Sequence, residues 1–189
     1  MNMNSLRFWR MPRPAWIRDS SGTAAVEFSL FLPIFGALLV GVIDFGGIIF
    51  AQSRLNSAVS AAANYAIVNA RNVTSTGASD LADSLAAVVN AAGRSGSVVV
   101  NAGPTRTITN GQSSSTGVAQ NAASCYCPSV ANHAVTWGSV TTCGAACAGG
   151  STAGKFVWIR IATNYTPAFS NYGLVESGVI DSHAMVRIQ

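Results

Sequence analysis

The sequence predicts an α+β protein in which a long N-terminal membrane-spanning helix precedes a small domain with a short helix and an antiparallel sheet. An apolar run over residues 28–51 has the length of a bilayer-spanning helix. An amphipathic pattern with three- and four-residue steps continues to about Arg71. After Gly93 the apolar residues alternate with a period of two, between turns rich in Gly, Ser, Asn and Pro. Strands that follow helices in this way are typical of the α+β class.

One continuous helix is expected from Thr23 to about Arg71. At ~1.5 Å per residue it would be about 70 Å long, more than twice the thickness of the hydrocarbon core of a bilayer, so its second half should project from the membrane. The positions that form one face of this second half are Leu55, Ala58, Val59, Ala62, Tyr65, Ala66 and Asn69. The chain is therefore divided into a leader (1–22), a transmembrane and stalk helix (23–71) and a globular domain (72–189).

The globular domain should begin with a second, shorter helix over residues 80–92, with Ser79 as its N-cap and Gly93 as its C-cap. Because apolar residues occupy both faces of the strand expected at 156–165, we expect that strand to be central. The expected strands cover residues 97–101, 105–109, 117–123, 133–140, 156–165 and 179–188.

Charge is sparse and unevenly placed. Charged residues make up 10% of the chain and hydrophobic residues 49%. From Thr23 onward seven basic residues face six acidic ones, which gives no electrostatic footprint for nucleic acid. Positive residues stay cytoplasmic, so the leader arginines predict a cytoplasmic N-terminus and a domain on the other side of the membrane. These arginines are Arg7, Arg10, Arg13 and Arg18.

A carboxylate, Glu27, stands at the start of the apolar run, and Gly22 provides a small, flexible bond upstream of it. An acid at this depth is costly unless it is paired, which suggests a function. The alternative is an interfacial acid in the first turn of an ordinary anchor helix, where it is favoured by the helix dipole.

Counted from Thr23, Glu27 is the fifth residue and Phe28 the sixth, which resembles the Gly-x-x-x-x-Glu-aromatic processing signal of type IV prepilins of the Flp class. Together with further matching segments, this pattern resembles the TadE/TadG-like pseudopilins of tight-adherence pilus systems. The further segments are Leu32-Pro33, Ile43-Asp44-Phe45-Gly46, Ala51-Gln52 with Leu55-Asn56 and, more weakly, Phe156-Val157-Trp158-Ile159 and Tyr165-Thr166-Pro167.

The resemblance implies a minor pseudopilin that acts in assembly, initiation or the tip of a tight-adherence pilus. A prepilin peptidase would cut after Gly22, and Glu27, beside Phe28, would pair with the Thr23 amine of a neighbouring processed subunit. The implied partners are the bacterial inner membrane, the peptidase, other pilin or pseudopilin subunits and the assembly machinery, with the C-terminal domain in the periplasm.

Two other interpretations remain open. The first is a signal-anchored periplasmic domain that binds a partner or ligand without a role in a pilus, which leader processing would distinguish. The second, more distant, is an oxidoreductase of the Cys-x-Cys type, which redox titration would distinguish. A cleaved secretory signal peptide is disfavoured because the apolar run exceeds the usual h-region of roughly 7–15 residues.

Asp44 is the second carboxylate of the expected span. It would lie near the far interface, where its side chain either reaches periplasmic water or makes a polar contact between subunits. The Asp-Phe-Gly triplet that it opens also occurs in protein kinases, but the chain has neither the glycine-rich loop nor the His-Arg-Asp loop of a kinase.

Four cysteines lie close together in sequence: Cys125, Cys127, Cys143 and Cys147. They suit two disulfides or one zinc ion, but zinc ribbons usually carry Cys-x₂-Cys knuckles and the expected periplasmic compartment oxidises thiols. We therefore expect two disulfides and no metal, with Cys125 and Cys127 each crossing to Cys143 or Cys147. Each bridge would close a loop of ~15–20 residues and contribute roughly 3 kcal/mol on the chain-entropy model.

No catalytic motif is present, so we expect neither an enzyme nor a cofactor. The two histidines, His133 and His183, have no nucleophile at motif spacing, and His183 is interpreted as a residue on the face of the last strand. No phosphate-binding or dinucleotide-binding fingerprint occurs. The remaining acids are interpreted as sparse surface residues without a metal cluster: Asp80, Asp83, Glu176 and Asp181.

Overall fold

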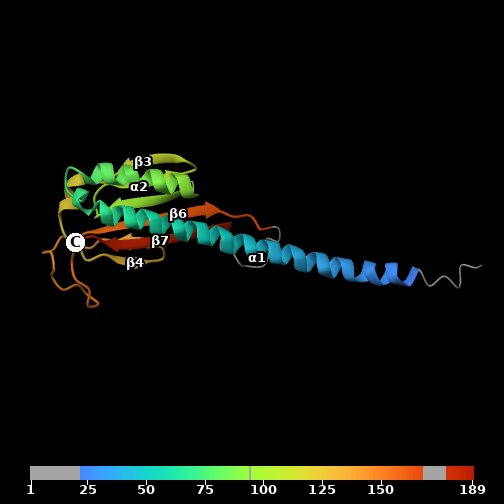
Figure 1. Ribbon diagram of the computed structural model, residues 1–189. Helices are drawn as coiled ribbons and strands as arrows, with labels where there is room; N and C mark the ends of the chain where they lie inside the picture. The colour runs from blue at the N-terminus through green and yellow to red at the C-terminus, as the bar shows by residue number, and fades with distance from the viewer. Residues whose placement is uncertain (1–21, 94, 168–177) are drawn as a thin grey trace, which may run out of the picture. The chain divides into compact units, whose positions relative to one another are not determined.

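The computed structural model describes residues 22–93, 95–167 and 178–189 (Figure 1). The expected leader, apart from Gly22, and its four arginines therefore lie outside the described residues, as does Glu176. The chain divides into two compact units, residues 1–42 and 43–189. Helix α1 (Thr23–Val68) begins in the first unit and ends in the second. The expected α+β class is confirmed, with one long apolar helix, one short helix and an antiparallel sheet.

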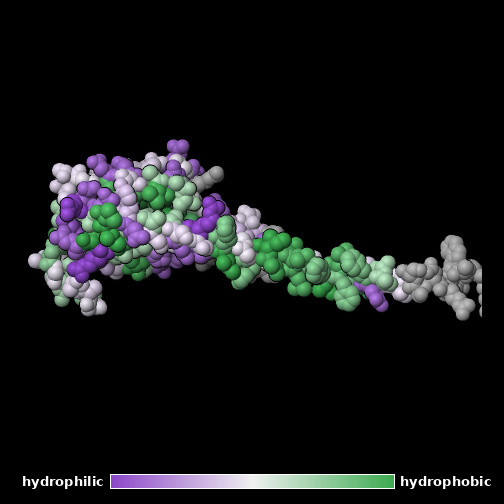
Figure 2. Space-filling model, in the orientation of Figure 1, coloured by the Kyte–Doolittle hydropathy of each residue, from purple (hydrophilic) through white to green (hydrophobic). Residues whose placement is uncertain are grey.

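Helix α1 is continuous and contains Pro33. Up to about Phe50 most of its large apolar side chains are exposed, and Figure 2 shows this part as a largely apolar surface. Within the second unit one face of the helix is buried in the core. The buried positions are Leu55, Val59, Ala62 and Ala66, which confirms most of the expected face, whereas Tyr65 is exposed. A short 3₁₀ turn, η3 (Ala70–Asn72), follows the helix.

Helix α2 (Ala78–Gly93) begins earlier than expected, and the assignment of Ser79 as its N-cap is wrong because Ser79 lies inside the helix. Thr74 supports the preceding turn instead: its hydroxyl oxygen accepts a hydrogen bond from the Gly77 N–H at 3.0 Å. Gly93 is the last helical residue, and its φ is not positive, so it is not a left-handed C-cap. A Cβ there would lie 2.9 Å from the carbonyl oxygen of Ala162, so glycine is needed for the close approach of helix and sheet.

The main sheet has the order β3-β2-β1-β6-β7, and every pair is antiparallel. β6 lies between two partners, and Trp158 and Ile159 are buried on its opposite faces, which agrees with the apolar character of that segment. Four of the expected strands are found within a few residues of their expected bounds. These four are β1 (Ser95–Val100), β2 (Thr105–Thr109), β6 (Phe156–Asn164) and β7 (Val179–Arg187), and the fifth strand of the sheet, β3 (Gln112–Thr116), was not expected.

Two strand predictions are wrong, and two strands, β3 and β4 (Ser129–Ala131), were missed. The segment 117–123 forms a 3₁₀ helix, η4 (Ala119–Ala123), in place of a strand. The segment 133–140 contributes only β5 (Ala134–Thr136), which pairs with β4 (Ser129–Ala131) in a separate hairpin. β3 escaped prediction because all of its residues are polar and exposed, so it carries no apolar alternation.

The two faces of the sheet carry different side chains. Along the antiparallel pair β6 and β7, side chains alternate between the faces. The helix face, defined by Val98, Val157, Ile159 and Ile161, belongs to one core with α2 and the second half of α1. The loop face, defined by Trp158, Arg160, Asp181 and His183, meets the segment between β3 and β6, as the hydrogen bond and the ring contact between these residues and His133 show.

Candidate functional site

The expected processing site lies at the start of α1. Gly22 directly precedes Thr23, the first helical residue, and both are exposed. A Cβ placed on Gly22 would meet no atom within 4 Å. The fold of this chain therefore does not require glycine at this position, and a requirement for glycine would have to come from another protein that acts on it.

Glu27 and Phe28 lie on the first turns of the same helix, and both are exposed. Among the residues that the structure describes, none forms an ion pair with Glu27. Apolar side chains between Phe28 and Leu38 line a shallow groove on the surface of the helix. The first unit thus presents one carboxylate beside an extended apolar surface, and it carries no other charged residue between Thr23 and Val42.

Asp44 lies in the second unit and is only 7% exposed. The hydroxyl of Tyr165 donates a hydrogen bond to the backbone carbonyl of Asp44 at 3.0 Å. Gly47 makes room for this contact, since a Cβ there would lie 2.5 Å from the Tyr165 oxygen. The end of β6 is therefore tied to α1 next to Asp44, a contact across 121 residues that the sequence did not indicate.

The four cysteines form two disulfides, Cys125–Cys143 and Cys127–Cys147, with Cα atoms 5.2 and 5.7 Å apart. The expected pair of bridges is confirmed, and the structure supplies the connectivity. Both bonds close the segment that meets the loop face.

A buried side chain, Asn101, ties the cystine segment to the sheet. It is completely buried, and its amide nitrogen donates hydrogen bonds to the carbonyls of Ala122 and Ser124 at 3.0 and 2.6 Å. Its amide oxygen accepts a hydrogen bond from the Phe156 N–H at 3.1 Å. The residue has a φ of 49°, a left-handed conformation in which Asn is enriched. One amide thus connects the end of β1, the beginning of β6 and the chain leading to Cys125.

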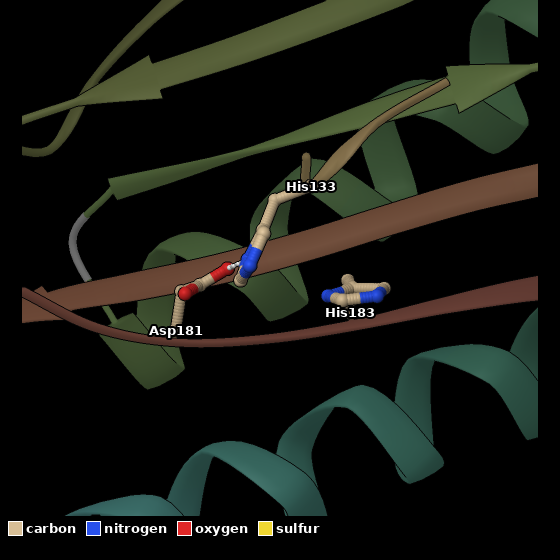
Figure 3. Close-up of side chains that lie close together, drawn as sticks. All are labelled: His133, Asp181 and His183. Atoms are coloured by element: carbon tan, nitrogen blue, oxygen red, sulfur yellow. Dashed lines mark hydrogen bonds and ion pairs between the residues drawn. The ribbon is translucent and has the colours of Figure 1, made fainter. Parts of the chain in front are cut away.

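A polar group gathers on the loop face (Figure 3). One carboxylate oxygen of Asp181 accepts hydrogen bonds from Nδ1 of His133 at 2.8 Å and from Nε of Arg160 at 3.0 Å. The ring of His183 lies 5.2 Å from that of His133 and 5.0 Å from that of Trp158, between centroids. Burial raises the pKa of Asp181, but the hydrogen bonds from His133 and Arg160 outweigh it, so the pKa lies below its ordinary value.

From the sequence these residues were expected to be separate and Asp181 to be a surface acid, whereas its side chain is only 14% exposed. The spacing of Asp181 and His183 was a usable signal, because residues two apart in a strand share a face. The arrival of His133 was not predictable, since it lies 48 residues from Asp181 and in a hairpin turn that had been expected to be a strand.

These features define a class: an α+β protein with one apolar N-terminal helix. Within the part of the chain that the structure describes, α1 alone is long and apolar enough to cross a membrane. The family model described as TadE-like protein matches residues 22–64, which confirms the resemblance found in the sequence. The match contains Gly22, Glu27 and Asp44 and associates the chain with tight-adherence pili. No curated protein and no solved structure matches the chain.

Proposed function

We propose that this protein is a minor pseudopilin that acts in assembly, initiation or the tip of a tight-adherence pilus. A prepilin peptidase cuts it after Gly22, and the first half of α1 holds it in the bacterial inner membrane. The observation that carries the proposal is the combination of Gly22, Glu27 and Phe28 with an exposed apolar helix, inside the segment that matches the TadE-like model.

The exposed apolar surface of α1 supports a lipid or protein environment for this helix. Most large apolar side chains from Val26 to Phe50 are about half exposed or more. A contiguous apolar surface of this kind is not left in water by a soluble protein and marks a membrane or protein interface. In such surroundings the carboxylate of Glu27 needs a partner. A new α-amino group at Thr23 of a neighbouring processed subunit supplies one.

The orientation is supported from both ends of the chain. Four arginines precede Gly22 in the sequence, which favours a cytoplasmic N-terminus. Two disulfides lie in the C-terminal part, and disulfides form and persist in oxidising compartments such as the periplasm. A periplasmic domain and a cytoplasmic leader are the arrangement that satisfies both. In this proposal the protein is neither an enzyme nor a nucleic-acid-binding protein.

Processing is tested by mass analysis of the N-terminus of the full chain, extracted from membranes of cells with and without the peptidase. We expect the mature chain to begin at Thr23 only when the peptidase is present, and Gly22→Val to abolish cleavage. Gly36→Val is the matched control, because a Cβ at Gly36 also meets no atom within 4 Å. An intact Met1 beside an active peptidase would leave the anchored periplasmic domain as the better description, whereas a chain that begins near Ala63 would indicate a cleaved secretory signal peptide; either result would contradict the proposal.

Assembly is tested with Glu27→Ala and Glu27→Gln. Both variants should be cleaved and inserted normally, because they do not alter Gly22, and both should lose cross-links between subunits, since neither can pair with an amine. Asp80→Asn, a change on the exposed surface of α2, is the control for loss of one negative charge. Unchanged cross-linking and fibre formation in both Glu27 variants would assign the intersubunit contact to another part of the helix.

A further inference from the structure

Three side chains on the loop face converge on one point. His133, Asp181 and His183 each offer a ligand atom, and these atoms lie within 4.8 Å of one another (Figure 3). Asp181 and His183 project from the same face of β7, because they are two residues apart in a strand. His133 comes from the turn between β4 and β5, where its φ of 59° is left-handed.

We propose that His133, Asp181 and His183 bind one divalent transition-metal ion, for which Zn²⁺ is the expected occupant. Two imidazoles and one carboxylate are a donor set that zinc takes when three protein ligands leave its fourth position to water. Ligand atoms about 2.1 Å from a tetrahedral zinc ion are about 3.4 Å apart. The three ligand atoms now lie within 4.8 Å of one another, with His133 Nδ1 and Asp181 Oδ2 only 2.8 Å apart, so binding requires these side chains to adjust their spacing within the site.

Asp181 is already held in a position suited to a ligand. Arg160 and His133 hydrogen-bond to the same oxygen, Oδ2, and within the described residues the other oxygen, Oδ1, accepts no hydrogen bond. Ligating carboxylates are usually held by a hydrogen bond from a residue outside the ligand set, and Arg160 supplies it here, whereas His133 is itself a proposed ligand. The backbone is tied as well, because the side-chain amide of Gln52 donates to the Asp181 carbonyl at 3.3 Å.

His183 has ring contacts but, within the described part of the chain, no hydrogen bond to its ring nitrogens. An ion pair between His133 and Asp181 would explain why those two residues lie together, but it would not explain why His183 lies beside them. A metal ion uses all three. The positive charge of Arg160 opposes a cation at this site, so we expect reversible binding with moderate affinity.

The bound ion would join the β4–β5 hairpin to β7. Ligand binding to the folded state alone stabilises that state, in proportion to the logarithm of the free metal concentration. The site thus adds a metal-dependent tie to a segment that the two disulfides already constrain. All four cysteines are in disulfides, so no thiol competes for the ion in the oxidised protein.

The test is titration of the oxidised full chain in detergent with Zn²⁺ by calorimetry, and with Co²⁺ by visible absorption. We expect one ion per chain. His183→Gln and His133→Asn should each weaken binding about tenfold or more, by loss of an imidazole ligand. His133→Asn removes the imidazole but keeps a residue that tolerates left-handed φ. Asp181→Asn and Asp80→Asn form a matched pair, of which only the first should weaken binding.

Thermal unfolding of the same proteins provides a second measurement. Zn²⁺ should raise the melting temperature of the native sequence and of Asp80→Asn, and should leave that of His183→Gln unchanged. His183→Gln is decisive if Asp181→Asn fails to fold, because within the described residues the ring nitrogens of His183 make no hydrogen bond that the substitution would remove. Absence of saturable binding with one ion per chain, or an affinity within twofold of the native value in both histidine variants, would overturn the proposal.

Discussion

The helix face and the loop face of the same sheet are stabilised by different means. On the helix face, aliphatic side chains of the sheet, α2 and the second half of α1 are buried together. On the loop face, a segment with few large apolar residues is held by two disulfides, by the buried amide of Asn101 and by the polar contacts of Asp181.

The comparison shows that one strand, β6, can belong to an apolar core on one face and to a polar cluster on the other. β6 contributes Ile159 and Ile161 to the apolar core and Arg160 to the polar group on the other face. Burial stabilises the helix face whenever water is the solvent. The disulfides stabilise the loop face only under oxidising conditions, and the proposed metal ion would add to this only where the metal is present. The two faces should therefore respond to different perturbations.

The largest expected effect is a cavity on the helix face. Leu85→Ala should lower the free energy of unfolding by about 2–5 kcal/mol, because Leu85 is fully buried in α2. Val118→Ala, which truncates an exposed side chain, should change it by less than about 0.5 kcal/mol. Denaturant unfolding of the full chain in detergent, followed by near-UV circular dichroism, measures both. A loss below about 1 kcal/mol in Leu85→Ala would show that the helix face is not the main core.

The second-largest expected effect is the loss of stability on removal of one disulfide. Cys125→Ser with Cys143→Ser should cost about 3 kcal/mol on the chain-entropy model, with an added cost because Cys125 is buried and a serine hydroxyl there would be desolvated. Cys127→Ser with Cys147→Ser removes the other bridge, which closes a loop of similar length, and lacks the desolvation cost expected at Cys125. Hydrogen exchange should show faster exchange in residues 119–154 and unchanged exchange in α2. Equal loss of protection in α2 would mean that the two faces unfold as one.

Asn101→Ala should cost about 1–3 kcal/mol, because it leaves the Phe156 N–H and the carbonyls of Ala122 and Ser124 without their partner. Asn101→Gly separates this loss from the left-handed φ, which glycine tolerates. Asn121→Ala is the matched control, since its amide makes one exposed hydrogen bond to Ala102. Denaturant midpoints of the three variants provide the measurement, and equal values for Asn101→Ala and Asn121→Ala would contradict the proposed tie.

The smallest effect concerns the ion pair between Asp83 and Arg106 at the edge of the helix face. The hydrogen bond from Arg106 lowers the pKa of Asp83 below its ordinary value, against a smaller opposing effect of burial. The folded state therefore gains stability above the ordinary Asp pKa of about 3.9 and loses it as the pH falls through the lower folded pKa.

Because the Asp83 side chain is 62% exposed, the gain should be below about 1 kcal/mol. Asp83→Asn should reduce the acid sensitivity of unfolding, measured between about pH 6 and about pH 3, while Asp80→Asn should not. A larger change in Asp80→Asn would show that general charge reduction, and not this pair, sets the acid sensitivity.

Local periodicity allowed much of the fold to be predicted. Apolar length located α1, three- and four-residue spacing located its buried face, two-residue alternation located β2, and a run that is apolar on both faces located β6. The same method failed at β3, which has no apolar residue, and at η4, where an alternating pattern forms a 3₁₀ helix against the sheet. Periodicity also misplaced the start of α2, because the turn before it depends on a hydrogen bond from the Gly77 N–H to the Thr74 hydroxyl.

By itself the sequence determined the features that depend on neighbouring residues: the apolar helix, the TadE-like resemblance of the segment 22–64 that a family model also matches, and the presence of four cysteines suited to two disulfides. Only the tertiary structure decided which cysteines pair, that the Asn101 amide hydrogen-bonds to the chain leading to Cys125, and that His133 meets Asp181 and His183. The physical reason is that periodicity records which side of an element faces water, whereas these contacts depend on how distant segments cross in the folded chain.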